Sequence, residues 1–297
     1  MTATATAGTG TTGAAPDEYV APRKSPWPVI GNAVAILVIA LWCLVPFYWM
    51  LVLSLRPNTD VFNPSLFFTN VTFSNYTYAF QEGNFGRALL NSLFIGAVVT
   101  IVGMVFGVFA AYASARLQFR GKGILLGAML AASMFPQVAL ITPLFQLFTN
   151  IGWLGTYQAI IIPQIAFALP LSVYTLTSFF REMPWELEQA AKVDGATPFQ
   201  AFRLVILPLA APAMFTTAIL VFLASWNDFL ISVLMYSNKP ELAPVTVAIA
   251  RFSVGPNQTP FVQPMAAGII VTIPLVLIVL LFQRRIVSGL TAGGVKG

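Results

Sequence analysis

Residues that could perform covalent chemistry are scarce in this sequence of 297 residues. It has no histidine and one cysteine, Cys43, which excludes imidazole acid–base catalysis, a Ser-His-Asp triad, a disulfide within the chain and every multi-cysteine metal site. Lys122 follows Gly121, but the rest of the phosphate-binding pattern GxxxxGK[ST] is missing around it. The sequence therefore predicts no catalytic residue and no metal site, and it lacks the phosphate-binding loop that ATP hydrolysis would need.

Charge is concentrated in one segment, 181–203. It holds seven of the 25 charged residues: Arg181, Glu182, Glu186, Glu188, Lys192, Asp194 and Arg203. A plain connection between two helices needs about 2–8 residues, so this segment is too long to be only a connector. One interpretation is an amphipathic elbow lying on lipid, but anionic headgroups would repel its acidic residues. We favour the docking of a partner protein.

The order of residues in this segment predicts two short helices that meet at Gly195. Pro184 suits a first helical position, and the acidic residues after it fall near the positive end of the helix dipole. Gly195 can adopt the left-handed cap that ends this helix. Thr197 and Pro198 then predict an N-cap and the first position of a second helix, which ends at Leu207-Pro208. Its apolar face would consist of Phe199, Phe202 and Ile206.

The rest of the chain predicts an all-α integral membrane protein. It is 58% hydrophobic and 8% charged, with a mean hydropathy of +0.81, whereas soluble domains are about 25% charged. A bilayer crossing needs roughly 20 apolar helical residues. The uncharged stretches accordingly predict six transmembrane helices, at 29–54, 88–115, 123–148, 157–180, 209–236 and 264–284. Gly103 and Gly107 in the second of them are spaced for close packing of another helix.

The basic residues predict the orientation of these helices. One set of loops holds eleven of them: Arg23, Lys24, Arg116, Arg120, Lys122, Arg181, Lys192, Arg203, Arg284, Arg285 and Lys296. The other set holds only Arg56, Arg87, Lys239 and Arg251. The positive-inside rule assigns the first set, and with it both termini, to the cytoplasm. The predicted domains are a disordered tail at 1–28, the membrane domain at 29–285 and a second cytoplasmic tail at 286–297. No clustered basic face predicts a nucleic-acid partner.

The charged segment also carries a family resemblance. The stretch Gln189-Ala190-Ala191-Lys192-Val193-Asp194-Gly195-Ala196, followed by Ile206-Leu207-Pro208, resembles the EAA loop of ATP-binding-cassette (ABC) importer permeases. The family usually has glutamate where Gln189 stands, while Glu188 lies one residue earlier. The departure puts one polar contact to the ATPase in doubt.

Other stretches are similar to the carbohydrate-uptake branch of that family, the maltose-permease-like group. They lie at 46–50, 54–56, 91–93, 226–229 and 283–297. The resemblance covers about 29–297 and implies a type I ABC importer permease fold in the inner membrane of a bacterium. It also implies that the chain is a transport subunit and not an enzyme.

The resemblance implies a set of partners in addition to membrane lipid. These are a second homologous permease subunit, two cytoplasmic ATPase subunits and an extracytoplasmic solute-binding lipoprotein. ATP and magnesium would be bound by the ATPases, with no cofactor in this chain. The loop at 181–208 would sit in a cleft on the ATPase and transmit its closure, through Glu186, Glu188, Gln189, Ala190, Ala191, Asp194, Gly195, Leu207 and Pro208.

A translocation pathway is the second site that the sequence suggests. Asp228 is the one acid within a predicted span, where a carboxylate costs roughly 2.5–3.5 kcal/mol and therefore faces water or the bundle interior. Trp226, Asn227 and Asp228 could line the outer mouth of a sugar pathway, and Gln137 and Gln164, beside helix-interrupting prolines, could face it. The alternative is a structural polar contact between helices or between permease subunits.

The solute itself has several possible identities. The resemblance favours a disaccharide or oligosaccharide of the trehalose or maltose type. A permease of the same importer type for a glycerophosphodiester or polyol is the first alternative. A stand-alone membrane transporter or enzyme is the second, and it would need several intramembrane acids where only Asp228 is present.

Overall fold

The computed structural model describes residues 27–62, 65–81, 84–237, 239–252 and 261–294. The chain divides at Pro46 into two compact units, residues 1–46 and 47–297. Residues 1–26 of the predicted tail lie outside the described residues, and helix α1 begins at Trp27. Both candidate sites belong to the second unit.

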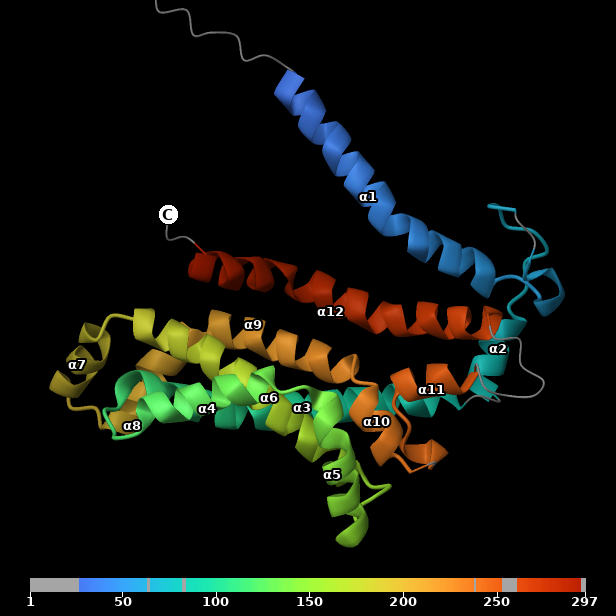
Figure 1. The fold of residues 1–297 in the computed structure, drawn as a ribbon. Coiled ribbons are helices and arrows are strands. Elements are labelled where there is room, and N and C mark those ends of the chain that lie inside the picture. The colour runs from blue at the N-terminus through green and yellow to red at the C-terminus, as the bar shows by residue number, and fades with distance from the viewer. Residues whose placement is uncertain (1–26, 63–64, 82–83, 238, 253–260, 295–297) are drawn as a thin grey trace, which may run out of the picture. The chain divides into compact units, whose positions relative to one another are not determined.

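The described residues are helical apart from turns and loops (Figure 1). The long helices are α1 (Trp27–Ser54), α3 (Phe85–Arg116), α6 (Tyr157–Glu182), α9 (Leu207–Trp226) and α12 (Val262–Gly294). The shorter ones are α2 (Ser74–Gln81), α4 (Lys122–Met134), α5 (Gln137–Asn150), α7 (Glu186–Val193), α8 (Pro198–Ala201), α10 (Leu230–Met235) and α11 (Val245–Phe252). A π-helical turn, Phe202–Ile206, joins α8 to α9, and 3-10 turns lie at Asn58–Asp60 and Pro240–Leu242.

The number of spans agrees with the sequence. Five helices among the described residues are long and apolar enough to cross a bilayer, and a sixth span results if α4 and α5 are taken together. This confirms an all-α membrane protein of six predicted crossings. The last helix, α12, continues to Gly294, so most of the predicted tail at 286–297 is helical.

The span predicted at 123–148 is not one continuous helix. The structure has two helices, α4 and α5, which meet at an angle of 94° around Phe135 and Pro136. Proline has no amide hydrogen for the helical ladder, and its ring disfavours a helical conformation in the residue before it. Phe135 accordingly has extended backbone angles, with φ of −73° and ψ of 130°.

The helix predicted at 209–236 is wrong at both ends. The apolar span runs from Pro198 to Trp226, because the chain stays helical through Pro208 and the short second helix does not end there. The π-helical turn just before Pro208 is the kind of local adjustment that lets a membrane helix contain proline. At the other end, the helix stops at Trp226 and a new one, α10, begins at Leu230.

Close packing of α3 against α6 forms the centre of the bundle. A Cβ atom added to Gly107 would lie 2.8 Å from the Cβ of Ser172, and one on Gly103 would lie 4.0 Å from that of Ala168. Small residues on both helices therefore allow their backbones to approach, as the spacing of the two glycines predicts. Helix α9 packs against both helices, and α12 packs against α9 and α2.

Many large apolar side chains point outward from this bundle. Ile101, Phe106 and Leu281, for example, are 63%, 60% and 76% exposed. An apolar surface of this extent would be a liability in water, but in a bilayer it contacts lipid tails. The fold thus presents large apolar side chains to the membrane in addition to those that it buries between helices.

Candidate functional site

The elbow, defined here as residues 181–208, turns sharply at the end of α7. Gly195 has φ of +89°, a left-handed conformation that favours glycine. Its amide donates a hydrogen bond to the carbonyl of Lys192 (3.1 Å), and the amide of Ala196 donates one to the carbonyl of Ala191 (2.9 Å). This pair of bonds is a Schellman motif, which satisfies carbonyls that the helix end leaves without partners. The predicted left-handed cap at Gly195 is confirmed.

The second arm of the elbow begins with a capping box, a reciprocal pair of bonds between Thr197 and Gln200. The Thr197 hydroxyl accepts a bond from the Gln200 amide (3.3 Å), and the Gln200 side chain accepts one from the Thr197 amide (2.7 Å). Pro198 is the first residue of the helix α8. The predicted N-cap is therefore confirmed, and both arms of the elbow are fixed by local bonds on either side of Gly195.

The elbow presents a mixed outer surface. Its most exposed apolar side chains are Val193, at 86%, Leu204, at 67%, and Phe199, at 61%. Predicted docking residues also exposed on it are Glu186, Gln189, Ala190, Asp194, Gly195 and Pro208, whereas Ala191 and Leu207 are half-buried. Exposed apolar groups ringed by acids and small residues suit protein contact better than lipid contact.

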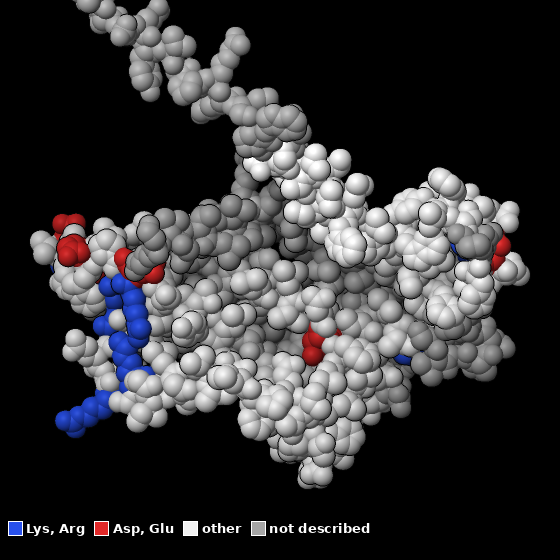
Figure 2. Space-filling model, turned by 45° about the horizontal axis from the view of Figure 1, so that its top comes forward, with Lys and Arg blue, Asp and Glu red and all other residues white. Residues whose placement is uncertain are grey.

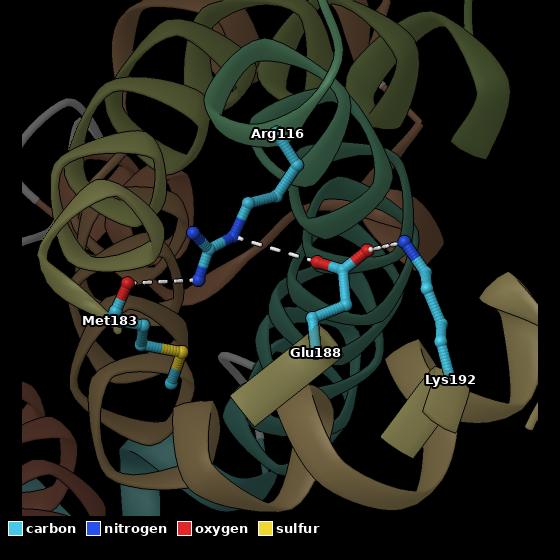
Figure 3. A network of polar contacts seen from close by, with 4 residues as sticks. All are labelled: Arg116, Met183, Glu188 and Lys192. Atoms are coloured by element: carbon cyan, nitrogen blue, oxygen red, sulfur yellow. Dashed lines mark hydrogen bonds and ion pairs between the residues drawn. The ribbon is translucent and has the colours of Figure 1, made fainter. Parts of the chain in front are cut away.

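Glu188 differs from the other predicted docking residues because its side chain is only 4% exposed. One carboxylate oxygen accepts a hydrogen bond from Lys192 Nζ at 2.9 Å, and the other lies 3.9 Å from Arg116 Nε at the end of α3 (Figure 3). Arg116 Nη2 donates to the carbonyl of Met183 (3.0 Å), and its guanidinium lies 5.1 Å from the Trp185 ring centroid. In this conformation Glu188 joins α7 to α3 and does not belong to the outer surface.

Arg116 and Trp185 were missed as site residues in the sequence. Arg116 entered only the count of basic residues, because its partner Glu188 lies in a different predicted element. The sequence contained one signal for this pair. Arg116 follows directly after the helix predicted at 88–115, and the acidic segment 181–203 follows the next two predicted helices. A buried carboxylate needs a cationic partner, but sequence spacing does not say which cation supplies it.

Asp228 is the centre of a second polar group, in the break between α9 and α10. Its Oδ2 accepts hydrogen bonds from Gln164 Nε2 (3.0 Å), the Ser232 amide (3.0 Å) and the Ser232 hydroxyl (2.7 Å). The Ser225 hydroxyl donates to the Oε1 of Gln164 (2.5 Å). Asp228 lies one residue before the N-cap position of α10, accepts bonds from amides in the first turn of that helix, and ties the broken helix to α6.

A small cavity of about 90 Å³ lies beside this group. Gln137, Gln164, Ser225 and Asp228 contribute its polar lining. The structure thus brings together three of the predicted pathway residues, from α5, α6 and the α9–α10 break. At about 30 Å³ for one water, the cavity has room for only a few waters, well short of the 300 Å³ or more of a small-molecule pocket.

Two predicted pathway residues lie elsewhere. Trp226 is 2% exposed and packs in an apolar cluster that includes Phe85 and Phe252. Asn227 is exposed, and its side chain donates to the carbonyl of Leu223 (2.8 Å) in its own helix. Neither side chain lines the cavity beside Asp228.

A larger cavity, of about 960 Å³, lies between the bent pair α4–α5 and helix α6. Its lining is almost entirely apolar and includes Pro143, Pro163 and Pro170, three prolines within these helices. Gln137 lines both this cavity and the small polar one, which places it at their boundary. The large cavity has the volume for a disaccharide but few groups to hydrogen-bond its hydroxyls.

Charged side chains are concentrated at the elbow. Figure 2 shows acidic and basic side chains gathered at the end where α7 and α8 lie, and only scattered charged side chains over the wide surface beside that end. Among the described residues, no group of three or more histidine, cysteine or acidic side chains could hold a metal ion. The arrangement suits docking and positioning rather than covalent chemistry.

Comparison with known proteins gives consistent results. A model of the family described as the binding-protein-dependent transport system inner membrane component matches residues 103–291. The trehalose transport system permease protein SugB of Mycobacterium tuberculosis is 50% identical over 260 residues, which cover 86% of this chain and 93% of that protein. The trehalose/maltose transport system permease protein MalG of Thermococcus litoralis is 40% identical, with 88% and 94% covered.

Two further similarities extend the comparison. The sulfoquinovosyl glycerol transport system permease protein SmoH of Agrobacterium fabrum is 35% identical, with 86% of this chain and 89% of that protein covered. A crystal structure of a bacterial ABC transporter involved in the import of the acidic polysaccharide alginate contains a similar chain. The TM-score is 0.72 at 23% identity, with 90% of this chain and 99% of that chain covered. At this identity the likeness concerns the fold.

Proposed function

The chain belongs to the family of inner membrane components of binding-protein-dependent transport systems, and we propose that it is the permease subunit of a sugar importer. The solute class that we infer is a disaccharide or short oligosaccharide of the trehalose or maltose type. The observation that carries this proposal is the 50% identity to a trehalose permease, which extends over 86% of the chain and includes the elbow. Because the family consists of transport subunits, the chain is not an enzyme.

The family implies an ATPase partner and a solute-binding partner. We propose the finer assembly of this chain with one homologous permease subunit, two ATPase subunits and an extracytoplasmic lipoprotein. ATP and magnesium belong to the ATPases in this assembly. The exposed apolar residues Val193 and Phe199, with Glu186, Gln189 and Asp194 around them, support docking of the ATPase on the elbow.

The orientation that we propose places the elbow and both termini in the cytoplasm. Support comes from the distribution of basic residues over the two ends of the bundle. Arg116 and Lys192 meet at the elbow, whereas Arg87 contacts the carbonyl of Glu241, and Lys239 that of Gly155, in other loops. Arg116 and Lys192, which the positive-inside rule assigns to the cytoplasm, are therefore near each other, and Arg87 and Lys239 contact loops of the other set.

For the solute pathway we propose the boundary between the two cavities. Gln137 is exposed there, and Gln164 and Asp228 form the polar wall behind it. The small cavity cannot hold a disaccharide by itself, so we infer that the second permease subunit supplies most of the hydrogen bonds to the sugar. Trp226 and Asn227 lie outside this wall, and we leave them out of the proposed pathway.

The decisive experiment measures solute-stimulated ATP hydrolysis by the complete importer in proteoliposomes, with its own binding protein. Trehalose, maltose, glycerophosphocholine and glycerol are compared at equal concentration. We expect trehalose or maltose to stimulate hydrolysis and the other two to have no effect. Stimulation by glycerophosphocholine or glycerol alone would overturn the sugar assignment while leaving the importer assignment intact. ATP hydrolysis that is the same with and without this chain would overturn both the sugar assignment and the importer assignment.

A second solute class has one observation in its favour. The sulfoquinovosyl glycerol permease is 35% identical to this chain over a comparable length, so a glycerol-linked solute fits the same scaffold. Because that identity is lower than the 50% and 40% of the trehalose and maltose permeases, we rank it second.

A further inference from the structure

We propose that Arg116, at the cytoplasmic end of α3, is the positioning residue that links the elbow mechanically to the transmembrane core. Together with Glu188 it forms a clamp, defined here as the side chains of Arg116, Glu188, Lys192 and Trp185 (Figure 3). The inference rests on the proposed function, because it assigns a route by which ATPase closure reaches the membrane helices.

Burial is the first argument for the clamp. The Arg116 and Glu188 side chains are 6% and 4% exposed, and charges buried this deeply are stable only in the presence of a partner. Arg116 Nε and Glu188 Oε2 face each other at 3.9 Å, and neither makes a hydrogen bond to another described residue. Lys192 also pairs with the Glu188 carboxylate, at 2.9 Å, so removal of Glu188 leaves two cations without their carboxylate, and removal of Arg116 leaves Glu188 with Lys192 alone.

The second argument is that α7 is too short to hold its own position. With eight residues it is about 12 Å long, and helices below about 12 residues are marginal without tertiary contacts. Arg116 contacts α7 through Glu188 and also the Met183 carbonyl, which caps the end of α6. A single side chain of α3 thus holds both the helix that carries the docking surface and the connection that leads into it.

Aromatic packing holds the other arm of the elbow to the same helix. The ring of Tyr112, one turn before Arg116 on α3, lies 4.5 Å from that of Phe202 and 5.9 Å from that of Phe180, measured between centroids. Both arms of the elbow are therefore attached to the last turn of α3, so a push on the elbow displaces α3 and α6 with it.

The test compares Arg116→Gln and Glu188→Gln in the complete importer in proteoliposomes. It records recovery of the ATPase with the purified complex, ATP hydrolysis and solute import. We expect the ATPase to be recovered as in wild type and hydrolysis to continue, while the ATP consumed per imported solute rises at least fivefold, the lower end of typical coupling between sites. Arg116→Lys should retain part of the coupling, which protects the test against a variant that fails to fold.

Controls and the double variant make the outcome decisive. Arg120→Gln and Glu241→Gln remove the same charges from exposed positions outside the elbow and should behave as wild type. The variant with both Arg116→Gln and Glu188→Gln should be no worse than the poorer single variant, because the two residues act as one unit. A wild-type ratio of ATP to solute in Arg116→Gln would overturn the proposal. Loss of the ATPase from that variant alone would also overturn it, since Arg116 would then serve docking, whereas failure of wild type to recover an ATPase would overturn the proposed function.

Discussion

Asp228 is surrounded by donors, and its hydrogen bonds assign it a structural role first. Two backbone amides of α10 and the side chains of Gln164 and Ser232 all donate to its carboxylate. An intramembrane acid is often a functional site, but here the donors come from the same chain and join α10 to α6. The alternative of a structural polar contact between helices therefore accounts for its geometry.

Replacement of Asp228 tests this role. Asp228→Ala removes the acceptor of two amides in the first turn of α10 and of the buried polar groups of Gln164 and Ser232, so we expect a loss of about 2 kcal/mol or more. Asp228→Asn keeps an acceptor oxygen and should lose less. The midpoint of thermal unfolding of the purified importer measures both variants. Asn227→Ala is the matched control, since that side chain bonds only to its own helix. An Asp228→Ala variant that unfolds with the wild-type midpoint would contradict the structural role.

Residue types in the elbow could be predicted, but the direction of each side chain could not. Gly195, Thr197 and Pro198 act through bonds to residues within five positions, so their roles follow from local order alone. Glu188 was grouped with the docking residues because it lies one residue before the family pattern that begins at Gln189. Its inward position depends on Arg116, which is separated from it in the sequence by α4, α5 and α6. Tertiary contacts of this kind join residues that are far apart in the sequence, so no regular residue spacing reveals them.

At the scale of elements, the elbow is a rigid corner whose angle depends on one backbone conformation. Gly195 has φ of +89° and nothing within 4 Å of the place where a Cβ would lie. A side chain there would meet no neighbour, so any effect of substitution comes from the backbone alone. The left-handed conformation costs a non-glycine residue about 1–2 kcal/mol.

We expect Gly195→Ala to weaken ATPase binding by about tenfold, because the altered corner presents Val193 and Phe199 at the wrong angle. The measurement is the affinity of the isolated ATPase for the permease complex in nanodiscs. Gly152→Ala is the matched control: Gly152 has φ of +72° and equally open space, but lies in the turn between α5 and α6. Equal weakening by both variants would mean that general strain, and not the corner, is responsible.

Helix positions could be predicted from the sequence much better than helix breaks. The starts of the helices predicted at 29, 88 and 157 lie within three residues of α1, α3 and α6. Five prolines were predicted to interrupt helices. The prediction holds at Pro136, where the chain bends, but is wrong for the prolines at 143, 163, 170 and 274, which lie inside unbroken helices. The break at Asp228 was missed. A proline leaves a backbone carbonyl of its helix without a hydrogen bond, and neighbouring helices can supply the missing partner. Whether the helix bends depends on those neighbours, which cannot be read from the amino-acid composition.

For the whole molecule, the distribution of charge predicts the orientation in the membrane. The fifteen basic residues divide eleven to four between the two sets of loops. The elbow, with its charge and exposed docking residues, lies on the side that has eleven. An ATPase can reach the elbow only from the cytoplasm, so the charge rule and the proposed function require the same orientation.

Cysteine labelling tests that orientation directly. In a background with Cys43→Ser, single cysteines replace exposed residues on opposite sides, Arg120→Cys in the α3–α4 loop and Glu241→Cys in the turn before α11. A membrane-impermeant maleimide applied to intact spheroplasts should label the cysteine at 241 and leave that at 120 unlabelled. After lysis both should react to the same extent, which controls for accessibility of the thiol. Labelling at 120 but not at 241 in intact spheroplasts would invert the topology, and the elbow could then not meet an ATP-driven partner.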